Sequence, residues 1–294
     1  MGCGDTLLTL SANAKINLTL DILGTREDGY HEVAMIMQEI SLHDTLSMGK
    51  INQGISLTIV IEGQQGTLPA DESNLCWKAA ALVQKEYNLQ EGVEIHLTKR
   101  IPMAAGLAGG SADAAAVLKG MNHLFRLGMT EARLCELGAR LGSDIPFCIM
   151  GGTMLATGRG EVLIRLPSFP RVSVVLAKPP VGVSTAWAYK TYDAGYDGPH
   201  PDNEAMLEAI HGGDAHKAAG LLCNVLEGVT ETEHPVIADY KRLMMEHGAM
   251  ASMMSGSGPT VFGLVREKQQ AWHLADTLKK YDGEAGVFVA ETLG

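Results

Sequence analysis

A run of small residues between Pro102 and Ala115 is the segment of this sequence best suited to chemistry. Its glycines at 106, 109 and 110 stand directly before an alanine-rich stretch. Glycines let the backbone approach a ligand closely, and a helix N-terminus adds unpaired N–H groups and the positive end of a dipole. Together these features predict a phosphate or other anion site that needs no lysine or arginine. The alternative is a turn that only joins a strand to a packing helix, because many glycine turns bind nothing.

This segment matches neither of two familiar phosphate motifs. No lysine follows the glycines, so the pattern G-x-x-x-x-G-K-[ST] is absent. The spacing of the glycines also differs from G-x-G-x-x-G, and no regular alternation of strands and helices supports a dinucleotide-binding domain. Any phosphate loop here is therefore of another kind.

Lys15 and Asn17 lie two residues apart inside an apolar stretch that is expected to be a strand. Residues i and i+2 of a strand share one face, so the two side chains point the same way. Taken alone, the pair is better explained by an edge-strand lysine that reaches solvent.

Asp144 is the third candidate, placed after Gly142 and before an apolar run. An acid at the exit of the expected helix is a candidate functional carboxylate. The alternative is an aspartate that caps a helix.

The charge balance excludes some classes of partner. The 294 residues include 23 Lys+Arg and 34 Asp+Glu, which gives a formal net charge of −11. Nucleic-acid and anionic-membrane binders need a surplus of basic residues, so we expect no nucleic acid and no membrane as partner. No apolar run approaches the length of a membrane span.

The order of expected elements is mixed, which favours an α+β fold with two domains over a doubly wound sheet. Strands are expected at 7–10, 14–23, 33–48, 55–61, 93–98, 153–157, 161–166, 172–177, 250–254, 260–265 and 287–290. Helices are expected at 74–87, 111–126, 130–141, 184–191, 203–222, 233–247 and 268–281, with Thr130 as an N-cap. The segment Pro167–Pro170 is the best candidate boundary, so residues 1–166 and 167–294 are the expected domains.

The cysteines and the N-terminus indicate the compartment. Five cysteines are scattered without a C-x-x-C pair, as is typical of reduced thiols in a cytoplasmic protein. No secretory signal opens the chain. Residues 1–6 satisfy a loose pattern for N-terminal acylation, but no second membrane signal accompanies it.

Read together, these segments resemble the GHMP kinase superfamily of small-molecule kinases. The resemblance is carried by Ala14–Leu18, Arg26–Glu32, Pro102–Ala115, Gly142–Phe147 and Met254–Thr260, which follow the family's order over nearly the whole chain. The segments D-G-Y-H and S-D-I-P-F narrow it to the branch that phosphorylates a cytidine-diphosphate-linked methylerythritol for isoprenoid synthesis. The implied fold has a ribosomal-protein-S5-domain-2-like N-terminal domain and a ferredoxin-like C-terminal domain.

The resemblance implies transfer of the γ-phosphoryl group of ATP, assisted by Mg²⁺, to the 2-hydroxyl of the methylerythritol unit. Asp144 matches the family's base, Lys15 matches the cation beside it, and Asn17 would orient the hydroxyl or the aspartate. No protein ligand of a metal is assigned. The phosphates would lie in the loop formed by Pro102, Met103, Ala104, Ala105, Gly106, Leu107, Ala108, Gly109, Gly110, Ser111 and Ala112.

The substrate's cytosine is implied to bind at Tyr30 and His31, where the ring of the tyrosine stacks on the base and the histidine bonds to its edge. Thr185 and Tyr189 resemble the contribution of the second domain to this pocket, and Gly256–Thr260 resembles the third superfamily motif. The alternative is that Gly256–Thr260 is only a hairpin turn between two strands. A zinc motif H-E-x-x-H is excluded, because Met35 stands where the second histidine would be.

The loop departs from the family's usual G-L-G-G-G-S-S-D-A at two positions. Ala108 replaces a glycine, which is tolerable if φ stays negative there, and Ala112 replaces the second serine. Ser111 is therefore the one hydroxyl assigned to the phosphates or the metal.

Two other interpretations stay open at this stage. One is another GHMP kinase, acting on homoserine, mevalonate or a sugar. The other is a non-catalytic nucleotide-binding protein of the same fold, although such a protein would not need a base and a cation together. The expected assembly is a monomer or a homodimer.

Overall fold

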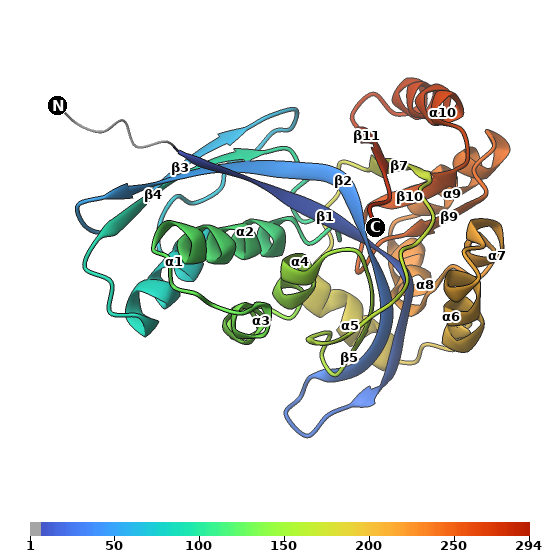
Figure 1. The fold of residues 1–294 in the computed structure, drawn as a ribbon. Helices are drawn as coiled ribbons and strands as arrows, with labels where there is room; N and C mark the ends of the chain where they lie inside the picture. Colours follow the sequence, from blue (N-terminus) through green and yellow to red (C-terminus); the bar gives the residue numbers. More distant parts are fainter. Residues whose placement is uncertain (1–6) are drawn as a thin grey trace. The chain divides into compact units, whose positions relative to one another are not determined.

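The computed structural model describes residues 7–294 (Figure 1). The acylation pattern at residues 1–6 lies outside this range. Among the described residues, no helix is both long and apolar enough to cross a membrane. The chain forms two compact units that are discontinuous in sequence. Unit 1 takes in the described residues up to Ala14, His43–Ile101 and Ala108–Met150, and unit 2 takes in Lys15–Leu42, Pro102–Leu107 and Gly151–Gly294.

Two long strands contribute to both units, since each is divided between them. They are β1 (Leu8–Thr25) and β2 (His31–Ile51). Unit 1 adds β3 (Ile55–Ile61), α1 (Leu75–Glu86), β4 (Gly92–Lys99), α2 (Gly109–Leu124), α3 (Glu131–Ala139) and α4 (Ile145–Met150). In this unit β4 pairs parallel with β3 and antiparallel with the second half of β2. Helices α1 and α2 pack on each other, and α4 packs on α2 and α3.

Unit 2 adds β5 (Thr153–Thr157), β6 (Val162–Arg165), β7 (Ser173–Lys178), α5 (Thr185–Asp193), α6 (Asn203–His211), α7 (Ala215–Ala219), β8 (Cys223–Asn224), α8 (Val225–Glu233), α9 (Val236–Glu246), β9 (Ala251–Met254), β10 (Val261–Val265), α10 (Lys268–Tyr281) and β11 (Gly286–Glu291). The first half of β2 pairs with β5, and β5 pairs with β6. Thr19 and Leu20 of β1 pair parallel with β8.

A second sheet lies wholly in unit 2, with strand order β11-β7-β10-β9. Its pairs are antiparallel, and α9 and α10 pack against it (Figure 1). In chain order its strands and packing helices read β7, α9, β9, β10, α10, β11, which is the β-α-β-β-α-β arrangement of ferredoxin-like folds. This agrees with the fold implied for the C-terminal part of the chain.

Most expected elements are present, and the differences have local causes. The strands expected at 7–10 and 14–23 are one strand, because the polar residues between them continue the pairing of β1. The helix expected at 203–222 is broken after His211, where Gly213 adopts φ +64° and Asp214 caps a new helix. The prediction of an N-cap at Thr130 is confirmed, since its side chain accepts from the N–H of Arg133.

A buried cluster of charges joins the elements of unit 1. Lys99 at the end of β4 is 2% exposed and donates to Asp113 on α2 at 2.7 Å and also to Asp44 on β2. The other oxygen of Asp44 accepts from the N–H of Ile101 at 2.8 Å. Burial raises the pKa of Asp113 to about 8, against the opposing effect of Lys99. One ammonium thus holds together β2, β4 and the first turns of α2.

We predict that Lys99→Met lowers the free energy of unfolding by roughly 3–5 kcal/mol, because it leaves the carboxylate of Asp44 buried without its cation. Urea denaturation followed by circular dichroism measures this change. The control is Lys217→Met, which removes an ion pair with Glu208 between two well-exposed side chains and should cost less than about 1 kcal/mol. Equal losses in the two variants would contradict a structural role for the cluster.

Candidate active site

Lys15 and Asn17 project from one face of β1 in unit 2, as the spacing predicts. The Nζ of Lys15 donates to the Oδ1 of Asn17 at 2.7 Å and to the carbonyl of Gly106 at 3.3 Å. Lys15 is 4% exposed, so its side chain does not reach solvent. The interpretation as an edge-strand lysine that reaches solvent is therefore wrong. A buried ammonium needs such polar partners, because an unpaired one is very costly.

Asn17 is held on both sides of its amide. Its Nδ2 contacts the sulfur of Met35 on β2 at 3.5 Å, while its oxygen accepts from Lys15. The amide therefore has one orientation, with the oxygen toward the ammonium. Its predicted contact with the substrate stays a prediction.

The turn between β9 and β10, here called the Met254–Gly258 turn, packs on the first half of the glycine loop. The Oγ of Ser255 donates to the carbonyl of Gly106 at 3.0 Å. A Cβ on Gly106, which has φ +74°, would lie 2.1 Å from the carbonyl oxygen of Ser255, and one on Gly256 would lie 3.4 Å from the Nζ of Lys15. The segment Gly256–Thr260 thus connects two strands, as the alternative of a hairpin turn predicts. It also lies next to Lys15 and the glycine loop. Gly106 must be glycine for this approach.

The second half of the glycine loop begins α2 two residues earlier than predicted. The helix starts at Gly109, so Ser111 lies in its first turn and not at its start. Ala108 is the N-cap with φ +56°, so the negative φ under which alanine would be easily tolerated there is not adopted. An alanine in this left-handed conformation is strained by about 1–2 kcal/mol. The N–H of Ala112 closes the first helical hydrogen bond, and the N–H groups before it have no partner within the helix.

Asp144 stands immediately before α4, a helix that the sequence did not predict. Its side chain is half-buried, and its peptide carbonyl accepts from the N–H of Cys148. Asp144 and the second half of the loop belong to unit 1, whereas Lys15, Asn17 and residues 102–107 belong to unit 2.

His31 is fixed by residues from α5. Its Nε2 lies 2.8 Å from the Oδ1 of Asp193, and its ring centroid lies 4.7 Å from that of Tyr189. The structure thus brings together two of the predicted pocket residues, His31 and Tyr189. Asp193 was missed, because nothing in its local sequence marks it as a partner for a residue far along the chain.

The other two predicted pocket residues have different neighbours. Tyr30 is 54% exposed, and the guanidinium of Arg159 lies 4.9 Å from the centre of its ring. Thr185, at the start of α5, lies 3.0 Å from Ser257, hydroxyl to hydroxyl. This contact links α5 to the Met254–Gly258 turn.

Within residues 7–294, no three His, Cys, Asp or Glu side chains gather in a way that could hold a metal ion. The hydroxyl of Ser111, which the loop motif connects with the phosphates, is half-buried.

Comparison with known proteins connects these features to a family. Residues 74–152 match the GHMP kinases N terminal domain, and residues 206–282 match the GHMP kinases C terminal domain. A solved structure described as 4-(cytidine 5'-diphospho)-2C-methyl-D-erythritol kinase superposes with a TM-score of 0.83 at 33% identity, covering 98% of this chain and all of that one. A homoserine kinase from Cytophaga hutchinsonii, at 19% identity and a TM-score of 0.77, covers 100% of this chain and 96% of its own and shares the fold. The predicted α+β GHMP kinase fold is confirmed.

Curated relatives narrow the assignment within the superfamily. The 4-diphosphocytidyl-2-C-methyl-D-erythritol kinase of Acetivibrio thermocellus is 48% identical over 286 residues, which cover 97% of this chain and 99% of the relative. Identity at this level over nearly the full length of both proteins favours this branch over the homoserine, mevalonate and sugar kinases. The chain belongs to the 4-diphosphocytidyl-2-C-methyl-D-erythritol kinase family of GHMP kinases.

Proposed function

We propose that this protein is an ATP-dependent kinase that phosphorylates the 2-hydroxyl of 4-diphosphocytidyl-2-C-methyl-D-erythritol in the non-mevalonate pathway to isoprenoid precursors. The observation that carries the proposal is the buried ammonium of Lys15, held by Asn17 and by the carbonyl of Gly106 in a glycine loop of the GHMP type. A protein that only binds nucleotides has no need of a buried cation in this position. The identity to curated kinases of this name supports the same substrate.

In the proposed reaction, the 2-hydroxyl oxygen attacks the γ-phosphorus of ATP and its proton passes to the carboxylate of Asp144. The bond between the γ-phosphorus and the bridging oxygen breaks, and ADP leaves. Such transfer depends mainly on positioning and on stabilisation of charge. Lys15 stabilises the oxygen as it becomes negative, and its own bonds to Asn17 and Gly106 fix where that charge is supplied.

The phosphates of ATP lie in the loop from Pro102 to Ala112 in this proposal. The N–H groups at the start of α2 and its dipole bind the β- and γ-phosphates. The left-handed Ala104, Gly106 and Ala108 turn successive peptide groups of the loop in different directions. Conformations of this kind are costly and persist where function or packing requires them.

The oxygen donors near the loop fit Mg²⁺, which prefers oxygen ligands and is usually bound through substrate phosphates and one or two carboxylates. Ser111 would be its protein hydroxyl contact. When bound, Mg²⁺ neutralises charge on the phosphates.

The cytidine pocket is proposed around His31, whose ring is fixed by Asp193 and packed on Tyr189. A histidine held in this way offers a defined edge to a cytosine. Thr185 and Tyr189 extend this surface from α5, and Tyr30 remains the candidate stacking ring from the preceding turn.

Three further predictions stay part of the proposal. The domain boundary is placed at 166/167, and the two matched family domains fall on either side of it. The protein is expected in the cytoplasm, as a monomer or a homodimer. Its acidic charge is the reason to expect no nucleic-acid partner.

Replacing Asp144 with Asn is expected to lower kcat at least about 100-fold while the Kd for ATP stays within a factor of two, because a general base is lost and the phosphate loop is intact. Lys15→Met should have a similar effect on kcat. A coupled assay for ADP and calorimetric titration with ATP measure the two quantities. Glu136→Gln is the control, an exposed acid on α3. A near-normal kcat in Asp144→Asn would show that Asp144 is not the general base.

Gly109→Ala is expected to weaken ATP binding by about tenfold or more. Its Cβ would lie 2.8 Å from the Nζ of Lys99 and 2.9 Å from Ile101, so the first turn of α2 must shift. Gly49→Ala on β2 is the matched control, since its Cβ also meets a side chain at 2.8 Å but lies outside the loop. Calorimetric titration with ATP compares the two variants, and equal affinities would argue against phosphate binding at α2.

Cytidine diphosphate should raise the Tm of the protein, because a ligand that binds only the folded state stabilises it. His31→Ala is expected to weaken this binding about tenfold without changing the Kd for ATP. His273→Ala, an exposed histidine on α10, is the control. If cytidine diphosphate did not change the Tm of the native protein, this result would count against a cytidine substrate.

A further inference from the structure

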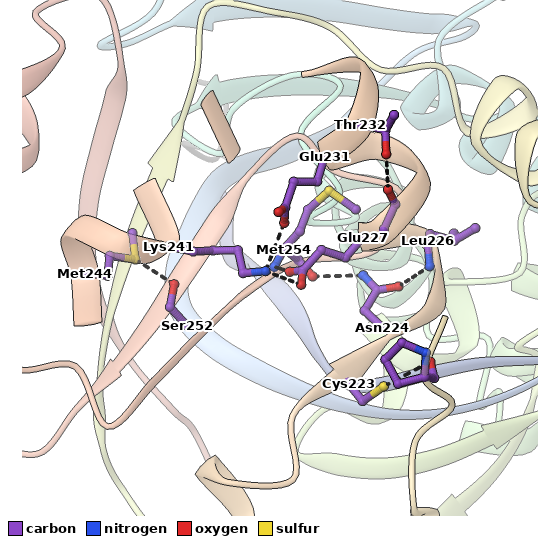
Figure 2. Close-up of polar contacts among 12 residues, drawn as sticks. Cys223, Asn224, Leu226, Glu227, Glu231, Thr232, Lys241, Met244, Ser252 and Met254 are labelled. Atoms are coloured by element: carbon purple, nitrogen blue, oxygen red, sulfur yellow. Dashed lines mark hydrogen bonds and ion pairs between the residues drawn. The ribbon is translucent and has the colours of Figure 1, made fainter. Parts of the chain in front are cut away.

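Asn224 has a side chain whose polar groups are all engaged. It is 5% exposed and caps α8, where its Oδ1 accepts from the N–H of Leu226 at 3.0 Å. Its Nδ2 donates to the carbonyls of Met254 at 2.9 Å and Gly256 at 2.8 Å. Figure 2 shows the amide between α8 and the end of β9. An N-cap needs only the oxygen, so the two donated bonds serve another purpose.

Glu227, one turn further along α8, binds the N–H of Met254, whereas Asn224 binds its carbonyl. Its Oε2 accepts from the N–H of Met254 at 2.6 Å, and its Oε1 accepts from Lys241 of α9 at 2.5 Å (Figure 2). Glu231 also accepts from Lys241, at 3.0 Å. Burial raises the pKa of Glu227, and Lys241 opposes this effect. Both peptide groups of Met254 are therefore fixed by side chains of α8.

The segment fixed in this way is connected to Lys15 through the carbonyl of Gly106. Ser255 lies between the two carbonyls that Asn224 binds, and its hydroxyl donates to the carbonyl of Gly106. That same carbonyl accepts from the Nζ of Lys15 at 3.3 Å. A continuous series of hydrogen bonds thus runs from α8 through the Met254–Gly258 turn to the ammonium.

We infer that Asn224 and Glu227 are positioning residues for phosphoryl transfer, which fix the ammonium of Lys15 through Ser255 and the carbonyl of Gly106. The inference rests on the proposed function for its catalytic consequence. Neither residue contacts the reacting atoms in this scheme. Their effect is to keep one carbonyl oxygen in place, and misplacement of a catalytic group by about 1 Å can cost on the order of 100-fold in rate.

The first test separates the cap of Asn224 from its contacts with the turn. Asn224→Asp keeps an oxygen for the N–H of Leu226 but loses both donors. We expect kcat to fall about 10- to 100-fold with the KM for ATP within a factor of two. Asp202→Ala, which removes the cap of α6 alone, is the control and should lower Tm without this loss of kcat. In a Lys15→Met background Asn224→Asp should cause no further loss of kcat, whereas a general structural defect would add its own loss.

The second test separates the ion pair from the contact with Met254. The double variant Glu227→Gln with Lys241→Met keeps an acceptor for the N–H of Met254 and leaves no unpaired cation, so it should retain most of kcat. In Glu227→Leu, kcat should fall by about as much as it does in Asn224→Asp. Arg242→Met removes the exposed neighbouring cation of α9 and is the control. Equal kcat values for Glu227→Leu and the double variant would overturn the role of Glu227.

A measurement without substrate makes the inference independent of the activity. Hydrogen–deuterium exchange should rise about tenfold or more in Asn224→Asp for peptides covering 254–258 and 104–107, while peptides of α10 keep their wild-type rates. Unchanged exchange in both segments would show the inference to be wrong, whether or not the native protein is active. Absence of kinase activity in the native protein, with the expected exchange, would instead contradict the proposed function.

Discussion

The carbonyl oxygen of Gly106 is the group on which the arrangement of the candidate site residues in unit 2 depends. It accepts one hydrogen bond from the ammonium of Lys15 and one from the hydroxyl of Ser255, and so both of its lone pairs are used. Lys15 is almost fully buried, so its charge is tolerated only while these partners stay in place. The absence of a side chain at Gly106 allows the backbone of Ser255 to come this close. The strand, the glycine loop and the Met254–Gly258 turn are therefore fixed relative to one another within this unit.

The acidic composition and the anionic substrates are compatible because the loop does not rely on surface charge. Lys99, the lysine closest to the loop in sequence, is buried between Asp44 and Asp113 and serves to hold α2 in place. In the proposed function, the backbone N–H groups at the start of α2 and its dipole bind the phosphates. A net charge of −11 thus argues against polyanion binding by a basic surface but not against the binding of a nucleotide in a shaped loop.

Much of the fold follows from local patterns, and the errors also have local reasons. The capping threonine at 130 and the apolar strands were predicted correctly, because caps and alternation act over a few residues. Helix α8 was missed although Asn224 and Glu227 have the spacing of a capping box, a signal that could have revealed it. The short helix α4 left no such signal. The left-handed conformation of Ala108 runs against the preference of alanine, so no sequence pattern could predict it.

The sequence by itself determined the residue types and the local geometry: the glycine loop before a helix, Lys15 and Asn17 on one face of a strand, and motifs specific enough to indicate the family. Only the tertiary structure decided which partners these residues have. Ser255 lies 149 positions from Gly106 along the chain, and Asp193 lies 162 positions from His31. Such contacts arise when distant segments pack and bury polar groups that must then be paired. Local patterns carry no information about which distant group will provide the pairing.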